Sequence, residues 1–154
     1  MVTNSAYTRH DVSPPTNTQF ALAVHVLTML AGLPRELQTS EGMAASAGSN
    51  PVHLRRVLGR LRNAGLVTSR PGPGGGWQLV NDSRATTLAD VWRAMNGDDP
   101  VLGLHAASPN CVVGQRIQGN LTEIDRRARA AIVAELETTT LADLAAATAL
   151  RAAS

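Results

Sequence analysis

A run of six proline and glycine residues occupies positions 71–76, between two short stretches of β-forming character. Residues 66–68 are Leu-Val-Thr, and the Trp-Gln-Leu-Val of residues 77–80 begins with an apolar and polar alternation. Short strands on either side of a turn that is rich in glycine and proline are typical of a β-hairpin. The sequence therefore predicts one small hairpin centred on this run.

Two helices are predicted directly before the hairpin. Thr39 or Ser40 can cap the first of them, which is short. The second covers about 50–64: Ser49 or Asn50 can cap it, Pro51 is tolerated in its first turn, and Gly65 suits the left-handed position past its end. A tight Ala-Gly-Ser turn separates the two helices. They therefore form a helix-turn-helix, and we call the hairpin its wing.

Apolar residues at helical spacing predict further helices, and these cover about 16–32, 87–97, 113–136 and 141–150. At 154 residues the chain is long enough for one domain, or for a small domain with a dimerisation extension. The expected fold is mainly α with a small β-hairpin: a winged helix-turn-helix followed by a long C-terminal dimerisation helix. The expected divisions are a flexible tail at 1–15, the winged helix-turn-helix domain at 16–97, a connecting or effector loop at 98–112 and dimerisation helices at 113–154.

The predicted helix at 113–136 carries a continuous apolar stripe along its whole length. Its members recur every three or four residues, and they are Val113, Ile117, Leu121, Ile124, Ala128, Ile132 and Leu136. This helix is much longer than the average helix of a globular protein. A stripe of that length requires a partner helix.

Positive charge is concentrated in one segment of the chain. The formal net charge of +2 is too small to identify a partner, but all fourteen basic residues are arginines. Between Ser49 and Gly75 the chain carries five of these arginines and no aspartate or glutamate. Such a local excess of positive charge favours a nucleic acid as partner.

The predicted helix at 50–64 has an apolar face, which comprises Leu54, Val57, Leu58 and Leu61. Its opposite face carries donors with little bulk between them, as a helix that enters the DNA major groove requires. We expect contacts to bases from the N-terminal half of this helix, through Asn50, Val52, His53 and Arg56. We expect contacts to the DNA backbone from hydroxyls near helix starts, from later arginines and from the wing, namely Ser40, Ser49, Arg60, Arg70, Gly72 and Gly74.

Other classes of function find little support in the sequence. The glycine run lacks the Lys-Ser/Thr pair that holds a nucleotide phosphate, and a strand rather than a helix follows it. No nucleophile and base, carboxylate pair or metal-ligand spacing emerges, so we expect no enzyme and no metal site. No apolar run is long enough for a membrane span and no secretory signal is present, so we expect a cytoplasmic protein. The alternative is a winged-helix module that binds other proteins and has little affinity for DNA.

Several segments resemble the Rrf-two (Rrf2) family of bacterial winged helix-turn-helix transcriptional regulators. The segments are Pro51-Val-His-Leu-Arg-Arg-Val-Leu, Leu61-Arg-Asn-Ala-Gly-Leu-Val, Arg70-Pro-Gly-Pro-Gly-Gly-Gly-Trp, Thr87-Leu-Ala-Asp-Val, Cys111-Val-Val-Gly and Thr140-Leu-Ala-Asp-Leu. The similarity covers about residues 18–145. It implies a homodimer whose long C-terminal helices cross and which binds a palindromic operator in double-stranded DNA. We expect this homodimer to be a repressor, and the sequence leaves repression or activation open.

Cys111 is the only cysteine of the chain. Family members with an iron-sulfur cluster carry three cysteines before the long helix, so the resemblance implies the cluster-free branch and no cofactor. A cluster would need other ligands, such as His105 or Asp98, and nothing in the sequence supports that. Cys111 lies just before the long helix, where free amides and the helix dipole favour a reactive thiolate. It is therefore a candidate redox sensor, and the alternative is a small apolar residue packed at the helix entry; the sequence identifies no effector.

Overall fold

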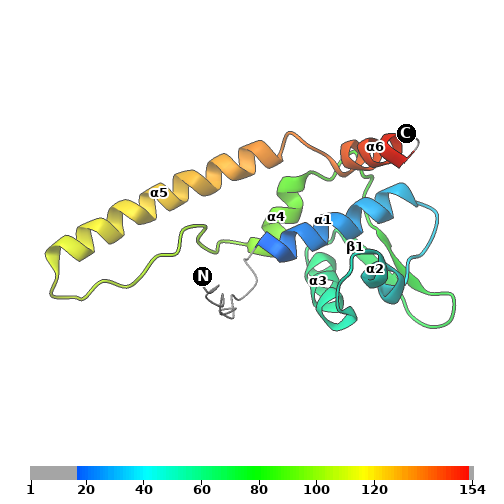
Figure 1. Cartoon of the computed structure of the whole chain (residues 1–154), viewed down its shortest axis with the longest axis horizontal. Helices are drawn as coiled ribbons and strands as arrows, with labels where there is room; N and C mark the ends of the chain where they lie inside the picture. The colour runs from blue at the N-terminus through cyan, green and yellow to red at the C-terminus, as the bar shows by residue number, and fades with distance from the viewer. Residues whose placement is uncertain (1–16, 153–154) are drawn as a thin grey trace, which may run out of the picture.

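The structure is a computed structural model that describes residues 17–152. These residues form six helices and one antiparallel hairpin (Figure 1). The helices are α1 (Asn17–Gly32), α2 (Ser40–Ser46), α3 (Pro51–Asn63), α4 (Leu88–Asn96), α5 (Val112–Leu136) and α6 (Leu141–Ala152), and the strands are β1 (Val67–Arg70) and β2 (Gly76–Leu79). The predicted fold class is confirmed, and the tail expected at 1–15 lies outside the described residues. No helix within residues 17–152 is long and apolar enough to cross a membrane.

Side-chain caps fix where the two helices of the helix-turn-helix begin. Thr39 accepts a hydrogen bond from the Gly42 amide at 3.1 Å, and Asn50 accepts one from the Val52 amide at 2.8 Å. Each cap satisfies an amide that has no partner within its helix. Past the end of α3, Gly65 has a φ of 74°, in the left-handed region that favours glycine. The structure thus selects Thr39 and Asn50 from the alternative caps.

Two glycines allow close backbone contacts of the wing, one within its own turn and one with the segment before α2. β1 and β2 pair in an antiparallel register that ends with Arg70 opposite Gly76. Gln38 and Trp77 add an isolated bridge, exchanging backbone hydrogen bonds of 3.0 and 2.8 Å. A Cβ atom on Gly76 would lie 2.8 Å from the Gln38 carbonyl oxygen, and one on Gly75 would lie 2.1 Å from that of Arg70. Both positions therefore require glycine for the wing to keep this shape.

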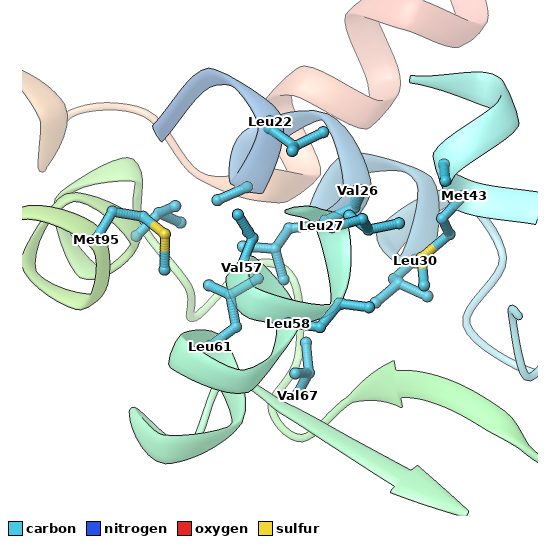
Figure 2. Packing of buried hydrophobic residues seen from close by; sticks show 14 of the residues in the cluster. Leu22, Val26, Leu27, Leu30, Met43, Val57, Leu58, Leu61, Val67 and Met95 are labelled. Carbon is cyan, nitrogen blue, oxygen red and sulfur yellow. The ribbon is translucent and has the colours of Figure 1, made fainter. Parts of the chain in front are cut away.

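The hydrophobic core joins α1 to the helix-turn-helix, and Figure 2 shows its packing. The apolar face predicted for α3 is confirmed, because Leu54, Val57, Leu58 and Leu61 are each at most 1% exposed. The cluster also includes Val26, Leu27 and Leu30 of α1, Met43 of α2, Val67 of β1 and Met95 of α4. Burial of this face sets the rotation of α3 about its own axis and leaves the opposite face in solvent.

The C-terminal helix α6 returns to the body and packs on α1 (Figure 1). The sequence Thr-Leu-Ala-Asp occurs at the start of both α4 and α6, with the threonine just before the helix. In each case the threonine and the aspartate side chains accept hydrogen bonds from each other's backbone amides. Thr87 and Thr140 form an isolated β-bridge, so the two helix starts lie side by side. Leu141 is fully buried in the core. These contacts fix α6 to the same body as α1 and α4.

Helix α5 stands out from this body, and the loop at 97–111 runs out to its start (Figure 1). We call the loop and α5 together the arm. Asp125 joins its two parts: this buried carboxylate accepts hydrogen bonds from the amides of Val101 and Leu102, at 2.8 and 2.7 Å. The Arg129 guanidinium lies 3.2 Å from the other carboxylate oxygen. One buried carboxylate therefore holds the loop against the helix.

The apolar stripe of α5 is left largely uncovered. Val113 is 66% exposed, and Ile117 and Ile124 are each 48% exposed. Within its own chain, α5 packs mainly on α4. The partner that the stripe requires is therefore not supplied by the described residues of the chain.

Candidate nucleic-acid interface

The face of α3 that points away from the core is the centre of the candidate interface. Val52 is 56% exposed there, and one turn farther along the exposed Arg56 guanidinium has no hydrogen-bond or ion-pair partner among residues 17–152. α2, α3 and the wing all lie on the side of α1 away from α6 (Figure 1). An α-helix with a free guanidinium has the width and the chemistry to enter a major groove.

Two later arginines of α3 have partners within the protein. Arg60, a predicted backbone contact, donates to the Met95 carbonyl oxygen at 2.8 Å and to the Gln19 side-chain oxygen at 3.1 Å. The Arg62 guanidinium lies 5.9 Å from the centre of the Trp77 ring, over the wing. Arg60 therefore ties α3 to α1 and α4, and Arg62 ties it to the wing.

Two of the four residues predicted to contact bases, Asn50 and His53, already have contacts within the protein. The Asn50 side-chain oxygen caps α3, which leaves only its NH₂ group for another partner. His53 is half-buried and lines a surface cavity of about 320 Å³ together with Ser49 and His25. The structure therefore places His53 and Ser49 beside α1, on one flank of the face that Arg56 occupies.

The first turn of α2 holds an acidic residue, Glu41, whose place in the candidate interface was not predicted from the sequence. Glu41 Oε1 lies 2.6 Å from Arg55 Nη2, and the Ser40 hydroxyl donates to Glu41 Oε2 at 3.1 Å. Hydrogen bonds from its own backbone amide, from Arg55 and from Ser40 hold the pKa of the Glu41 carboxyl below its ordinary value. The sequence did contain a sign that Glu41 is unusual, because it is the only acidic residue between positions 37 and 81.

The wing presents a basic residue and a bare backbone. Arg70 is exposed at the end of β1, and its guanidinium has no partner in the part of the chain that the structure describes. Gly72 and Gly74 have φ values of 85° and 72°, with no atom within 4 Å of the place where a Cβ would stand. A phosphate group can therefore approach the amides of the wing tip without meeting side chains.

A model of the Rrf2 family, described as an iron-dependent transcriptional regulator, matches residues 16–147. This match spans the helix-turn-helix, the wing, the arm and the first part of α6. The chain belongs to the Rrf2 family. This Rrf2 protein is therefore a winged-helix transcriptional regulator, as the resemblance of its sequence implied.

Individual relatives of this Rrf2 regulator agree with that assignment. YwnA of Bacillus subtilis, named as an HTH-type transcriptional regulator, is 33% identical over 129 residues, which cover 83% of this chain and 95% of YwnA. A transcriptional regulator from Lactobacillus plantarum matches with a TM-score of 0.71 and 25% identity, over 84% of this chain and 89% of that one. CymR, the global cysteine regulator of B. subtilis, matches with a TM-score of 0.59 and 26% identity, over 95% and 98%. These relatives are regulators and not enzymes, which confirms that prediction.

The family description names iron, but the donor set of this Rrf2 regulator does not fit an iron centre. Cys111 is the only thiol, and it caps α5 in an exposed position, where its sulfur accepts a hydrogen bond from the Gly114 amide at 3.3 Å. Within residues 17–152, no three His, Cys, Asp or Glu side chains are grouped so that they could hold a metal ion. His105 and Asp98, the other ligands considered from the sequence, form no such group with Cys111. The described residues therefore offer no site for the iron that the family description names.

Proposed function

We propose that this Rrf2 regulator is a homodimeric repressor that binds a palindromic operator, with α3 in the major groove and the wing on the DNA backbone. The free outer face of α3 carries the proposal, because Val52 and Arg56 project there from a helix whose other arginines have partners. A free guanidinium can bind the O6 and N7 atoms of a guanine in a bidentate manner. A dimer bound in this way keeps other proteins from the DNA that it covers.

Within this proposal the interface has two classes of contact. Base contacts come from the N-terminal half of α3 and are assigned to Asn50, Val52, His53 and Arg56. Backbone contacts come from helix starts, the end of α3 and the wing, and are assigned to Ser40, Ser49, Arg60, Arg70, Gly72 and Gly74. Arg60 contributes through the nitrogens that its bonds to Met95 and Gln19 leave free.

The exposed stripe of α5 supports the homodimer. Ile117 and Ile124 stand in solvent on a 25-residue helix, and a second copy of the same helix would cover them. Two-fold symmetry then gives the dimer two identical winged helix-turn-helix domains, one for each half-site. Two-fold symmetric helix-turn-helix proteins read half-sites about 34–36 Å apart, one turn of DNA, which is why we propose a palindrome.

Selection of bound fragments from the genome of the source organism tests the proposal. We expect the recovered fragments to share a palindrome whose half-sites are about 10 base pairs apart. Binding to that palindrome should weaken steeply as the salt concentration rises, because arginine contacts to phosphates release counterions. A response that is flat in salt, with no shared sequence, would instead favour a module that binds proteins.

Two further parts of the proposal concern the signal. We propose that the protein works without an iron-sulfur cluster, so anaerobically purified protein should show no visible absorption from a cluster.

Cys111 remains the candidate redox sensor, since it is exposed at the start of α5. Peroxide should then change operator binding of the native protein and not of Cys111→Ser, whereas equal binding of treated and untreated native protein would remove this role.

A further inference from the structure

The strongest unexplained feature of the interface is the acidic residue within it. Glu41 stands in a stretch of 45 positions, 37–81, that holds no other acidic residue. Both of its carboxylate oxygens are engaged, one by Arg55 and the other by the Ser40 hydroxyl. Ser40 is one of the backbone contacts of the proposed function, and Arg55 precedes Arg56 on α3. A carboxylate therefore occupies two donors on the surface to which we assign DNA binding.

Stability of the fold gives little reason for this pair. The side chains of Arg55 and Glu41 are 56% and 63% exposed. Exposed ion pairs contribute at most about 1 kcal/mol to stability, and often nothing measurable. A functional role of the pair therefore has to lie in its effect on a molecule that approaches this surface.

A phosphate group is the partner that such a pair would affect most. A guanidinium and a hydroxyl are the donors that phosphate oxygens accept from, and here a carboxylate already accepts from both. DNA of any sequence carries phosphates, and binding without sequence preference rests on arginine and lysine contacts to them. Neutralisation of Arg55 by Glu41 removes one cation from that contact.

Resting on the proposed DNA-binding function, we propose that Glu41 is a specificity-determining residue. It competes with DNA phosphate for Arg55 and Ser40 and so weakens binding to DNA that lacks the operator. In the operator complex Arg55 stays paired with Glu41, because the base contacts of Arg56 supply the affinity. On other DNA, Arg55 must leave Glu41 to reach a phosphate.

Binding of Glu41→Gln to two duplexes over a series of salt concentrations tests this proposal. One duplex of about 30 base pairs has an arbitrary sequence, and the other carries the palindrome recovered by selection. We expect Glu41→Gln to bind the arbitrary duplex about threefold to tenfold more tightly than the native protein, because Arg55 is released. The slope of log K against log salt should steepen by about 0.9, the value for one added phosphate contact. Affinity for the palindrome should change less, so the preference for it falls.

Two variants serve as controls. Glu123→Gln removes a matched exposed ion pair on α5, where Glu123 lies 2.7 Å from Arg126, and it should bind both duplexes as the native protein does. In the double variant Glu41→Gln/Arg55→Ala the gain should disappear, because Arg55 is its source. Thermal unfolding of each variant establishes that the fold is intact.

The outcomes separate the two proposals. Equal salt slopes for Glu41→Gln and Glu123→Gln on the arbitrary duplex would overturn the role of Glu41, as would a gain that persists in the double variant. A native protein that binds neither duplex in a salt-dependent manner would instead overturn the proposed function. The role of Glu41 is thus tested separately from DNA binding as such.

Discussion

The arginines of α3 differ in what their guanidinium groups contact, and this difference leads to distinct predictions. Arg56 has no partner within residues 17–152. We expect Arg56→Ala to lower the preference for operator over arbitrary DNA by about 1–3 kcal/mol, because a base contact is lost. Titration of the same two duplexes at one salt concentration measures this preference.

Arg60→Ala is the matched comparison, since Arg60 binds the Met95 carbonyl oxygen at the end of α4. We expect it to weaken binding to both duplexes equally. It should also lower the free energy of unfolding by about 1 kcal/mol, because that carbonyl loses a charged donor. If Arg56→Ala and Arg60→Ala lose affinity in parallel on both duplexes, the assignment of Arg56 to bases is wrong.

Two glycines should respond to alanine with opposite signs. We expect Gly75→Ala to lower the free energy of unfolding by about 1–3 kcal/mol, because its Cβ would lie 2.1 Å from the Arg70 carbonyl oxygen. Gly59→Ala should raise it by about 1 kcal/mol, because Gly59 lies within α3 with open space around it and alanine favours a helix. Urea denaturation measures both changes, and a loss of stability in both variants would contradict this account.

At the scale of elements, the arm depends on one buried carboxylate. Removal of Asp125 leaves the Val101 and Leu102 amides without an acceptor and takes from Arg129 its buried ion-pair partner, so that only the exposed Asp98 remains beside this guanidinium. Breaking a buried pair costs about 3 kcal/mol, which corresponds to a change of about a hundredfold in an equilibrium constant. We therefore expect hydrogen exchange at both amides to accelerate by about that factor in Asp125→Ala.

Asp125→Asn provides the control for this prediction. Its side-chain oxygen can still accept from the two amides, while the charge opposite Arg129 is lost. Exchange at Val101 and Leu102 should therefore accelerate less than in the alanine variant. Unchanged protection of these amides in Asp125→Ala would show that Asp125 does not hold the loop to α5.

At the scale of the whole molecule, the exposed stripe of α5 predicts the oligomeric state. We expect Ile124→Glu to convert a dimer into a monomer, because a charge would have to be buried between two helices. Affinity for the palindrome should then fall by about a hundredfold or more, because the second half-site is no longer bound together with the first. Light scattering after size-exclusion chromatography measures the mass.

Ala130→Glu places the same charge on the opposite face of α5, where Ala130 is also exposed. This variant should remain a dimer and keep its affinity for the palindrome. Dimers of unchanged stability in Ile124→Glu would contradict the assignment of the stripe to the interface between two copies.

Much of the fold could be predicted from neighbouring residues alone. The turn at Gly65, the threonine and asparagine caps and the inward face of α3 all depend on residues within about one turn of each other. The run at 71–76 likewise admits little besides a tight turn, whatever surrounds it. For this reason the sequence by itself determined the helices and strands, their order and which face of α3 is exposed to solvent.

Only the tertiary structure decided which exposed side chains of that helix are free. Arg55 pairs with a residue 14 positions away, and Arg60 with residues 35 and 41 positions away, so spacing along α3 contains no trace of these partners. The packing of α6 on α1 is equally long-range. Contacts of this kind arise when buried faces bring distant elements together, and they leave Arg56 and Arg70 as the unpartnered arginines of the helix-turn-helix and wing within the described residues.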